Sequence, residues 1–600
     1  MNPQLTYLLQ QSLQHLQRGN FPAAEILLNE AIKIDPFQVE ANRFLGIIHA
    51  QTGSKEQALL FFKRALSVAP GDGIILSNIG NVLHGLKRHH EALEYYDKAI
   101  FLLPNYAEVY SNKGNTLYEL SRYEEALSSY KKAVSLAPNY AQAFSNQGNS
   151  LLKLGRFTEA MTSHDKSILL EPNDRQAWLN RGNTLYEIKN FNEAIADYSK
   201  AIELDGNYVE AWSGRANALN QLERYHDAIN NYSRAIELNP NYTEALLNKG
   251  GVLFTLNHAH EALECFDAAI KINPGLGLAW SNKGGILSQL GQHDQAIECY
   301  ERGIAIEPKN PSIHKNKGVL LHKLQRYGDA LSCYDMAMAY SPLDADLHFK
   351  IGLSNRAIGR HSAAIKNFEN AIEYNYNPRE DAEFVLSALK SENFSKRMPK
   401  SYTANLFNQF AESFDGHLLK KLKYQSPKIT LSLLKPYLKK DSKILDLGCG
   451  TGLMGSELQP YSKNITGVDL SKEMLKKSKE TGAYSELFED DIHNFTAKCQ
   501  EKFSLIVSTD VFIYIGDLSA IFRNIEPLLE KPGLLCFTVE KGLTKDFFLS
   551  PDTLRYSHSK EYIERLAAAH SLSIVDILDS PIRENNGVNV NGHYFLLQKK

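Results

Sequence analysis

A glycine-rich segment near residue 450 has the composition of a loop that holds a ligand with its backbone. The segment KILDLGCGTGLMG places apolar residues before three closely spaced glycines. Glycine has no Cβ, so the backbone can approach a ligand and adopt turns that other residues disfavour. A dinucleotide-binding loop would need a third glycine where Leu453 stands, so this loop is not predicted to bind a dinucleotide. We assign five of its positions to cofactor binding: Asp446, Gly448, Cys449, Gly450 and Gly452.

Acidic residues follow three later segments that read as the strands of an α/β sheet. ITGVDLS contains Asp469, and an acid at the carboxyl end of a parallel strand can accept hydrogen bonds from vicinal ribose hydroxyls. LFEDDIHNF supplies Asp491 and Ile492, with Asp490 as the alternative one residue earlier. FSLIVSTDVFIYIGDL supplies Asp510 in the loop after the fourth strand. The second group of cofactor residues is therefore Asp469, Leu470, Asp491, Ile492 and Asp510.

These elements, in this order, resemble class I S-adenosylmethionine-dependent methyltransferases. The pattern Asp446-x-Gly-Cys-Gly-Thr-Gly is typical of that family, and the later segments follow at matching distances across residues 440–540. The resemblance implies an α/β Rossmann-like domain with S-adenosylmethionine as its cofactor. It also implies that Asp491 contacts the adenine amino group while Ile492 packs on the ring. The alternative is a degenerate domain of the same fold that binds no cofactor.

Catalysis by such a site depends mainly on alignment, because a sulfonium already carries an activated methyl group. A general base helps only if the acceptor must lose a proton. His558 and Tyr514 are the candidate catalytic residues, although His558 and Ser559 could instead cap the next helix. Tyr514 suits the wall of an acceptor cavity better than it suits an acid. No metal site is predicted.

The segment after the fourth strand narrows the range of acceptors. No Asn/Asp-Pro-Pro-Tyr sequence is present there, which counts against methylation of planar amide or adenine nitrogens by that motif. In the helix before the first strand, Phe410, Phe414 and His417 are candidates for a lid over the cofactor, and the alternative is that they pack in the core.

The elements that precede this domain form a repeat of 34 residues. The pattern Ala-x3-aromatic-x2-Ala-x4-Pro recurs, for example as Ala92, Tyr96, Ala99 and Pro104, and its register covers residues 5–378 as eleven copies. A glycine at the eighth position lets two helices approach closely, and the proline ends the second helix. The pattern resembles the tetratricopeptide repeat family, which implies helix pairs stacked into a superhelical solenoid with a concave face.

The predicted architecture is an all-α tetratricopeptide solenoid followed by an α/β Rossmann-like class I methyltransferase domain. We predict the repeats at 5–378, a capping helix and linker at 379–401, and the methyltransferase domain at 402–600. Segments 402–434 and 554–568 also resemble bacterial tetratricopeptide-repeat methyltransferases. That resemblance implies the reaction class and is silent on the methyl acceptor.

Asparagine recurs at two positions of the first helix of the repeat, in seven copies at the sixth position and in five consecutive copies at the ninth, on the side away from the predicted core. Asparagine is a mediocre helix former, so local propensity does not favour such a ladder. Its amide donates and accepts hydrogen bonds, as an extended peptide backbone requires. The ladder resembles that of O-GlcNAc transferase, and the alternative is inherited repeat sequence with solvated side chains. The predicted partner-binding residues, at the sixth position, are Asn78, Asn112, Asn146, Asn180, Asn248, Asn282 and Asn316.

Composition limits the remaining function classes. The 600 residues carry a formal net charge of −3, which argues against a protein that coats nucleic acid. Six cysteines are too few for a disulfide scaffold, and the first residues lack the pattern of a signal peptide. No apolar stretch is long enough to span a membrane, so we expect a cytoplasmic location.

Three functions fit the sequence. The first is an S-adenosylmethionine-dependent methyltransferase whose repeats recruit a protein partner or substrate. The second is a methyltransferase for a small metabolite whose repeats serve as an anchor. The third is a non-catalytic scaffold with a relic cofactor domain. The identity of the acceptor and the oligomeric state are not encoded in these motifs.

Overall fold

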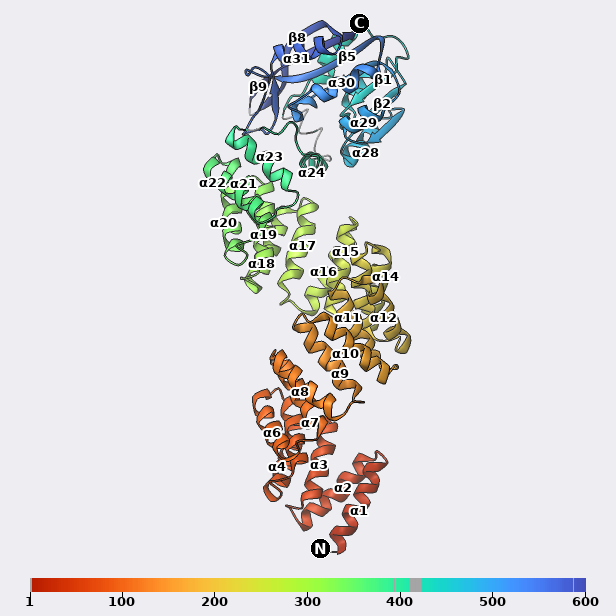
Figure 1. Cartoon of the computed structure of the whole chain (residues 1–600), viewed down its shortest axis with the longest axis vertical. Coiled ribbons are helices and arrows are strands. Elements are labelled where there is room, and N and C mark those ends of the chain that lie inside the picture. The colour runs from red at the N-terminus through yellow and green to blue at the C-terminus, as the bar shows by residue number, and fades with distance from the viewer. Residues whose placement is uncertain (1–2, 393, 411–415, 417–421, 586) are drawn as a thin grey trace. The chain divides into compact units, whose positions relative to one another are not determined.

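The computed structural model describes residues 3–392, 394–410, 416, 422–585 and 587–600 (Figure 1). The chain divides into two compact units, Met1–Gly291 and Gln292–Lys600. Within the described ranges, no helix is both long and apolar enough to cross a membrane.

The first unit consists of helices that pair in sequence order, two helices to each 34-residue repeat. The bounds are α1 Pro3–Gln17, α2 Phe21–Ile34, α3 Val39–Gln51, α4 Lys55–Val68, α5 Gly73–Gly85, α6 His89–Leu102, α7 Ala107–Glu119, α8 Tyr123–Leu136, α9 Ala141–Lys153, α10 Phe157–Leu170, α11 Arg175–Glu187, α12 Phe191–Leu204, α13 Val209–Gln221, α14 Tyr225–Leu238, α15 Thr243–Thr255, α16 Ala259–Ile272 and α17 Gly277–Gln289.

The second unit continues the repeats and closes them with one further helix. The bounds are α18 His293–Ile306, α19 Pro311–Lys323, α20 Tyr327–Met338, α21 Ala345–Ala357, α22 His361–Glu373 and α23 Arg379–Lys390. Two helices for every 34 residues continue through α22, which agrees with the predicted all-α repeat fold.

Within a helix pair, the repeat glycine lies close against an aromatic ring of the second helix. A Cβ placed on Gly114 would lie 2.6 Å from Cε1 of Tyr130, so only glycine allows this spacing. The Tyr130 hydroxyl donates a hydrogen bond of 2.7 Å to Oδ1 of Asn115. The same ring is therefore packed by the glycine and oriented by an asparagine.

Some of the asparagine ladder is internal structure, which corrects the prediction that all of it faces the concave surface. Nδ2 of Asn146 donates to Oδ1 of Asn115 in the preceding repeat at 2.9 Å. Asn180 is buried and donates to Oγ of Ser145 at 2.9 Å. These amides link neighbouring repeats to each other, because a buried amide is costly unless it is hydrogen-bonded.

The remainder of the second unit is an α/β domain built on one sheet. Its helical elements are α24 Lys400–Phe410, α26 Ser426–Leu434, α27 Leu453–Leu458, α28 Lys472–Glu480, α29 Ile492–Lys498, η2 Phe512–Tyr514, α30 Ser519–Leu528 and α31 Lys560–Ala569. Its strands are β1 Ile444–Leu447, β2 Ile465–Asp469, β3 Glu486–Glu489, β4 Phe503–Ser508, β5 Leu529–Lys541, β6 Phe547–Leu549, β7 Tyr556–His558, β8 Leu572–Asn585 and β9 Val588–Lys599.

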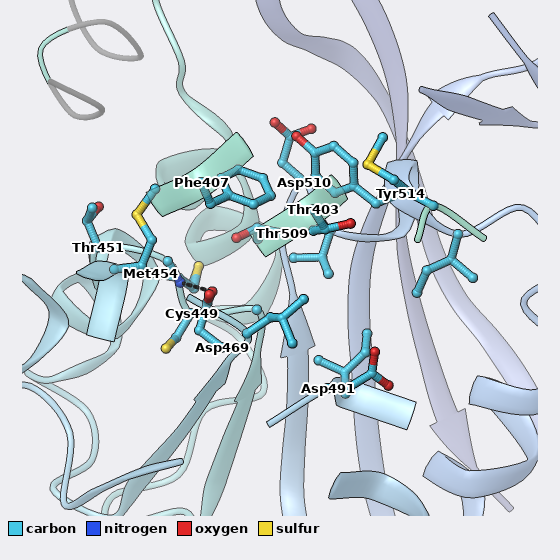
Figure 2. A pocket seen from close by; sticks show the side chains of 18 of the residues that line it. Thr403, Phe407, Cys449, Thr451, Met454, Asp469, Asp491, Thr509, Asp510 and Tyr514 are labelled. Atoms are coloured by element: carbon cyan, nitrogen blue, oxygen red, sulfur yellow. Dashed lines mark hydrogen bonds between the residues drawn. The ribbon is translucent and has the colours of Figure 1, made fainter. Parts of the chain in front are cut away.

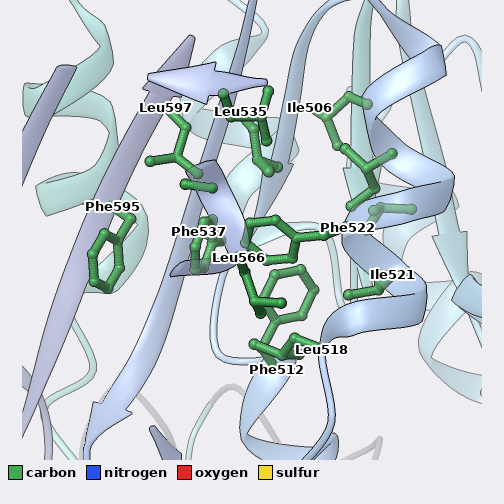
Figure 3. Close-up of a cluster of buried hydrophobic side chains, with 14 of the residues drawn as sticks. Ile506, Phe512, Leu518, Ile521, Phe522, Leu535, Phe537, Leu566, Phe595 and Leu597 are labelled. Carbon is green, nitrogen blue, oxygen red and sulfur yellow. The ribbon is translucent and has the colours of Figure 1, made fainter. Parts of the chain in front are cut away.

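The sheet has the order β3-β2-β1-β4-β5-β7-β6, and β9 pairs with both β5 and β8. Strands β1 to β5 are parallel to their neighbours, whereas β9 is antiparallel to β5. Helices α30 and α31 cover one face, where Phe522 and Leu566 pack against Phe537 of β5 (Figure 3). This is the predicted Rossmann-like arrangement, with the switch in strand order between β1 and β4.

The segment predicted as a linker packs in a core that the last repeat shares with the α/β domain. Phe368 of α22 and Phe384 of α23 belong to the same buried cluster as Met398, Leu554 and Tyr556. The last repeat and the sheet are therefore joined by packed side chains as well as by the chain itself.

Two adjacent glycines of α15 test the close approach within a helix pair. A Cβ on Gly250 would lie 2.9 Å from Cζ of Phe266, whereas a Cβ on Gly251 would meet nothing within 4 Å. We expect Gly250→Ala to destabilise the first unit by about 1–3 kcal/mol through overpacking. Gly251→Ala should stabilise it by roughly 0.5–1 kcal/mol, since glycine is a poor helix former. Thermal unfolding followed by circular dichroism measures both, and equal shifts for the two variants would contradict the packing role.

Candidate functional site

One cavity lies at the carboxyl ends of the parallel strands. The chain crosses from β1 to β2 on one side and reaches β4 on the other, so the loops after β1 and β4 separate and leave a crevice. Thr403 and Phe407 also line this crevice (Figure 2). Both belong to α24, which comes before β1 in the chain. The lining includes eight of the ten predicted cofactor residues: Gly448, Cys449, Gly450, Asp469, Leu470, Asp491, Ile492 and Asp510.

The glycine-rich loop is held tightly against its neighbours. Gly448, Gly450 and Gly452 all have positive φ values, of 74°, 55° and 91°, in the left-handed region that favours glycine. A Cβ on Gly448 would lie 2.3 Å from Cγ2 of Val511, in the loop after β4. The two loops therefore approach so closely that the first cannot carry a side chain at this point. Gly452 begins α27 and does not line the cavity.

Asp446, which was predicted to bind the cofactor, does not line the cavity and instead contacts residues that support the glycine-rich loop. Its Oδ2 accepts a hydrogen bond of 2.7 Å from the Tyr484 hydroxyl, which itself accepts the Gly455 N–H at 3.1 Å. Oδ1 is buried without a hydrogen-bond partner in the described chain. Burial raises the pKa of Asp446 to about 7, against the lowering effect of the Tyr484 hydrogen bond.

Asp469 lies at the end of β2, where its carboxylate ties two loops together. Oδ2 accepts the Gly450 N–H at 2.9 Å, and Oδ1 accepts the Ser471 N–H at 2.8 Å. Burial raises the pKa of Asp469, while these backbone hydrogen bonds lower it. Ser471 in turn donates from Oγ to Oδ1 of Asn408 in α24, at 2.6 Å. The carboxylate is thereby fixed in the cavity wall beside the glycine-rich loop.

The loop after β3 resolves the choice between two neighbouring acids. Asp491 lines the cavity and caps α29, because its Oδ1 accepts the His493 N–H at 3.0 Å. Asp490 lies outside the lining, and its Oδ1 accepts the Asp491 N–H at 2.8 Å. Ile492 lies beside Asp491 in the lining and supplies an apolar surface. The structure thus brings the favoured pair to the cavity.

The loop after β4 carries a carboxylate that a buried arginine orients. Asp510 has a φ of 60°, and its N–H donates to Oγ1 of Thr538 at 2.7 Å. Its Oδ1 accepts a hydrogen bond of 2.7 Å from Arg583, which also pairs with Glu540. Although burial lowers the pKa of Arg583, the two carboxylates raise it, so the guanidinium stays charged. Tyr514 lines the same end of the cavity, and burial raises the pKa of its hydroxyl.

His558 is not brought to the cavity, which corrects its assignment as a catalytic base. It is fully buried, and its Nε2 lies 3.0 Å from the carbonyl oxygen of Gly516. Burial lowers its pKa to about 4, so the ring is neutral near pH 7. The next residue, Ser559, caps α31 by accepting the Tyr562 N–H at 3.1 Å, as the alternative interpretation predicted.

Several residues of the site had no signal in a motif. Arg583 and Tyr484 act through Asp510 and Asp446, and each is distant in sequence from the carboxylate that it contacts. Arg555 lies in the family-like segment RYSHS and lines the cavity. The sequence could have indicated Arg555 as a site residue in place of His558, because both lie in this segment. Of the predicted lid residues, Phe414 and His417 lie outside the described residues, as does the side chain of Phe410.

Comparison with known families agrees with this geometry. A family model described as a methyltransferase domain matches residues 418–574. Models for tetratricopeptide repeats match residues 9–73, 72–139, 111–169, 176–208, 209–242, 243–276, 284–325 and 323–382. The chain is therefore a tetratricopeptide-repeat protein that carries a methyltransferase domain.

Curated relatives match the methyltransferase part of the chain. Ubiquinone biosynthesis O-methyltransferase of Actinobacillus pleuropneumoniae serotype 7 (strain AP76) is 30% identical over 115 residues, which is 18% of this chain and 49% of that protein. Uncharacterized methyltransferase C1347.09 of Schizosaccharomyces pombe is 28% identical over 143 residues, which is 22% of this chain and 48% of that protein. The chain spans about half the length of these two relatives.

Solved structures similar to the repeats include YrrB, described as a TPR protein with an unusual peptide-binding site. It is 26% identical and has a TM-score of 0.27, with 31% of this chain and 97% of that chain covered. Yeast Tom70 is 14% identical with a TM-score of 0.37, covering 65% of this chain and 96% of that chain.

The buried carboxyl of Asp446 predicts a pH dependence of stability. Its pKa of about 7 in the folded chain exceeds the value of about 3.9 expected when unfolded, so the folded state binds the proton more tightly. This contribution is present below pH 4 and is lost as pH rises through 7, by about 4 kcal/mol at most. Only the native chain loses this stability as pH rises, because asparagine does not titrate. Between pH 5 and pH 8, the unfolding temperature of the native chain should therefore fall relative to that of Asp446→Asn. A difference that stays constant over this range would show that Asp446 does not titrate there.

Proposed function

We propose that this protein is an S-adenosylmethionine-dependent methyltransferase whose repeats recruit a protein partner or substrate. The observation that carries the first half is the position of Asp469. Its carboxylate lies in the cavity wall, fixed to the glycine-rich loop by the Gly450 N–H. The carboxylate can accept hydrogen bonds from ribose hydroxyls at the end of this strand, and the glycines of the loop leave room for the remainder of the cofactor.

The other lining residues fit the same cofactor. Ile492 and Leu470 offer apolar surface next to Asp491, which suits a flat base with a polar edge. Met454 and Cys449 also line the cavity. Asp446 would hold the cofactor indirectly, by supporting the loop through Tyr484. When bound, S-adenosylmethionine supplies an activated methyl group on its sulfonium.

The chain's own contribution to transfer would be orientation and exclusion of water. Phe407 of α24 packs edge-on against Tyr514, with ring centroids 5.3 Å apart, and both line the cavity. Asp510, oriented by Arg583, offers a carboxylate that can accept a hydrogen bond from an acceptor N–H or O–H group. Such positioning accounts for rate without a base, because proximity and alignment dominate this chemistry.

Cofactor binding tests the proposal directly. Asp469→Asn keeps the size of the side chain and removes the charge that accepts ribose hydroxyls. We expect calorimetry with S-adenosylmethionine to show a loss of roughly 10- to 100-fold in affinity, the value of one or two charge-assisted hydrogen bonds. Asp490→Asn is the matched control, since Asp490 lies outside the lining, and it should bind like the native protein. A folded native protein that does not bind the cofactor would contradict the proposal.

The second half of the proposal concerns the repeats, whose asparagines now separate into two kinds. Asn146 and Asn248 donate hydrogen bonds to asparagines of the preceding repeat, at 2.9 and 3.0 Å. For Asn112 and Asn282, the described chain records no side-chain hydrogen bond, and Asn282 is exposed. The second kind is the better candidate for contact with an extended polypeptide.

A paired comparison distinguishes partner binding from stability. The double variant Asn112→Ala, Asn282→Ala should reduce capture of protein partners while leaving the unfolding temperature unchanged. The control, Asn146→Ala with Asn248→Ala, should lower the free energy of unfolding by about 1–2 kcal/mol, because it removes inter-repeat hydrogen bonds. If neither pair alters partner capture, the concave face does not recruit through these amides.

The alternative functions differ in where the methyl group goes. Incubation with methyl-labelled S-adenosylmethionine and a cell extract separates them. Label in a discrete protein band supports recruitment of a protein substrate, and label in the low-mass fraction supports a metabolite methyltransferase. Cofactor binding without transfer to any fraction supports the non-catalytic scaffold.

A further inference from the structure

The acids that line the cavity are already satisfied by the protein. Asp469 accepts two backbone hydrogen bonds, from Gly450 and Ser471. Asp510 accepts a hydrogen bond from Arg583, whose side chain is only 2% exposed. Neither carboxylate therefore needs a cation from the lining itself.

The lysine and arginine side chains of the lining differ in whether an acid lies beside them. Nη1 of Arg397 lies 3.8 Å from Oδ1 of Asp491, and Nζ of Lys400 lies 3.6 Å from Oδ2. Arg555 also lines the cavity, yet the described residues supply no ion pair or hydrogen bond to its guanidinium. A half-buried guanidinium next to a cavity is costly to leave without an acceptor, so a ligand is its natural partner.

Arg555 lies near Tyr514, and both residues line the cavity. Burial raises the pKa of the Tyr514 hydroxyl, and the charge of Arg555 is the largest effect that opposes this rise. Figure 2 shows Asp510 and Tyr514 on the opposite side of the cavity from Thr451 and Met454. The guanidinium of Arg555 can therefore contact a part of a ligand that extends from the glycine-rich loop towards Tyr514.

The loop that carries Arg555 is fixed by the last repeat. Arg356 of α21 donates from Nη1 to the carbonyl oxygens of Pro551 and Asp552, at 3.2 and 2.8 Å. Leu554, with a φ of 55°, is buried in the core shared with α22 and α23. The loop closes on itself, since the Ser550 N–H donates to the carbonyl oxygen of Arg555 at 3.0 Å. One side of the loop faces the repeat, and the other delivers Arg555 to the cavity.

We propose that Arg555 binds an anionic group, a carboxylate or a phosphate, of a molecule held in the cavity, and that Arg356 of the last repeat positions it. This inference rests on the proposed methyltransferase function. Two molecules could supply the anion: the methyl donor, through the carboxylate of its amino-acid part, or the acceptor. An arginine suits either, because its planar donors match carboxylate and phosphate oxygens.

Binding measurements with three adenosine ligands identify the source. Calorimetry would compare S-adenosylmethionine, S-adenosylhomocysteine and 5′-methylthioadenosine, of which the last lacks the carboxylate. If the donor supplies the anion, Arg555→Gln should weaken the first two ligands by about 10- to 100-fold and leave the third unchanged. If the acceptor supplies it, all three affinities should stay the same while transfer of labelled methyl to the extract falls by a similar factor.

Two results would overturn the inference. One is equal weakening of all three ligands, which would mean that Arg555 only shapes the cavity. The other is native affinity together with native transfer. Failure of the native protein to bind S-adenosylmethionine is a different result, and it would remove the proposed function rather than this inference alone.

The positioning role of Arg356 has its own test in the full-length chain. Arg356→Gln should weaken the same ligand or transfer step as Arg555→Gln, by about 3- to 10-fold, with the same selectivity among the three ligands. Arg356→Lys keeps a charged donor and should restore part of the loss. Arg379→Gln is the matched control, because Arg379 of α23 is exposed and pairs only with Glu383 among the described residues. A loss that lacks this selectivity, or that Arg379→Gln reproduces, would assign Arg356 a general structural role.

Discussion

Strands β1 and β4 are adjacent and parallel, but the chain continues from them towards opposite edges of the sheet. Their loops must separate, and the site depends on this divergence. The gap can hold a ligand only if the loop after β1 stays close to the strand ends, which is why Gly448 lies where a Cβ would meet Val511. Asp469 and Asp510 then reach the gap from the neighbouring strand ends, because parallel strands end at the same edge.

The repeats also depend on glycines that allow close packing. Each helix pair is too small to form a core alone, so the contact between glycine and aromatic ring sets the distance within a pair. Oδ1 of Asn115 accepts hydrogen bonds from Tyr130 of its own pair and from Asn146 of the next repeat, so this amide links the two pairs. The same type of bond joins Asn248 to Asn217, so part of the asparagine ladder holds neighbouring repeats together.

Much of the fold was readable from the sequence, because both parts depend on local spacing. The 34-residue period predicted the helical repeats, and the strand with its glycine-rich loop predicted a Rossmann-like sheet domain. The site was less complete. Asp446 was predicted to bind the cofactor but does not line the cavity, since a motif gives the residue type and not the direction of its side chain. Arg583 and Tyr484 act across the fold, so no spacing in the chain could reveal them.

Because the last repeat shares a core with the sheet domain, it cannot be exchanged as freely as the other repeats. Most repeats contact only their neighbours, so in principle a copy can be gained or lost by recombination without damage to either end. The last copy is different, because Phe368 and Phe384 complete the packing around Leu554 and Tyr556 of the sheet domain. A gene fusion that joined this methyltransferase domain to another array would have to bring helices α21 to α23 with it. The sheet and its final repeat therefore form one packing unit.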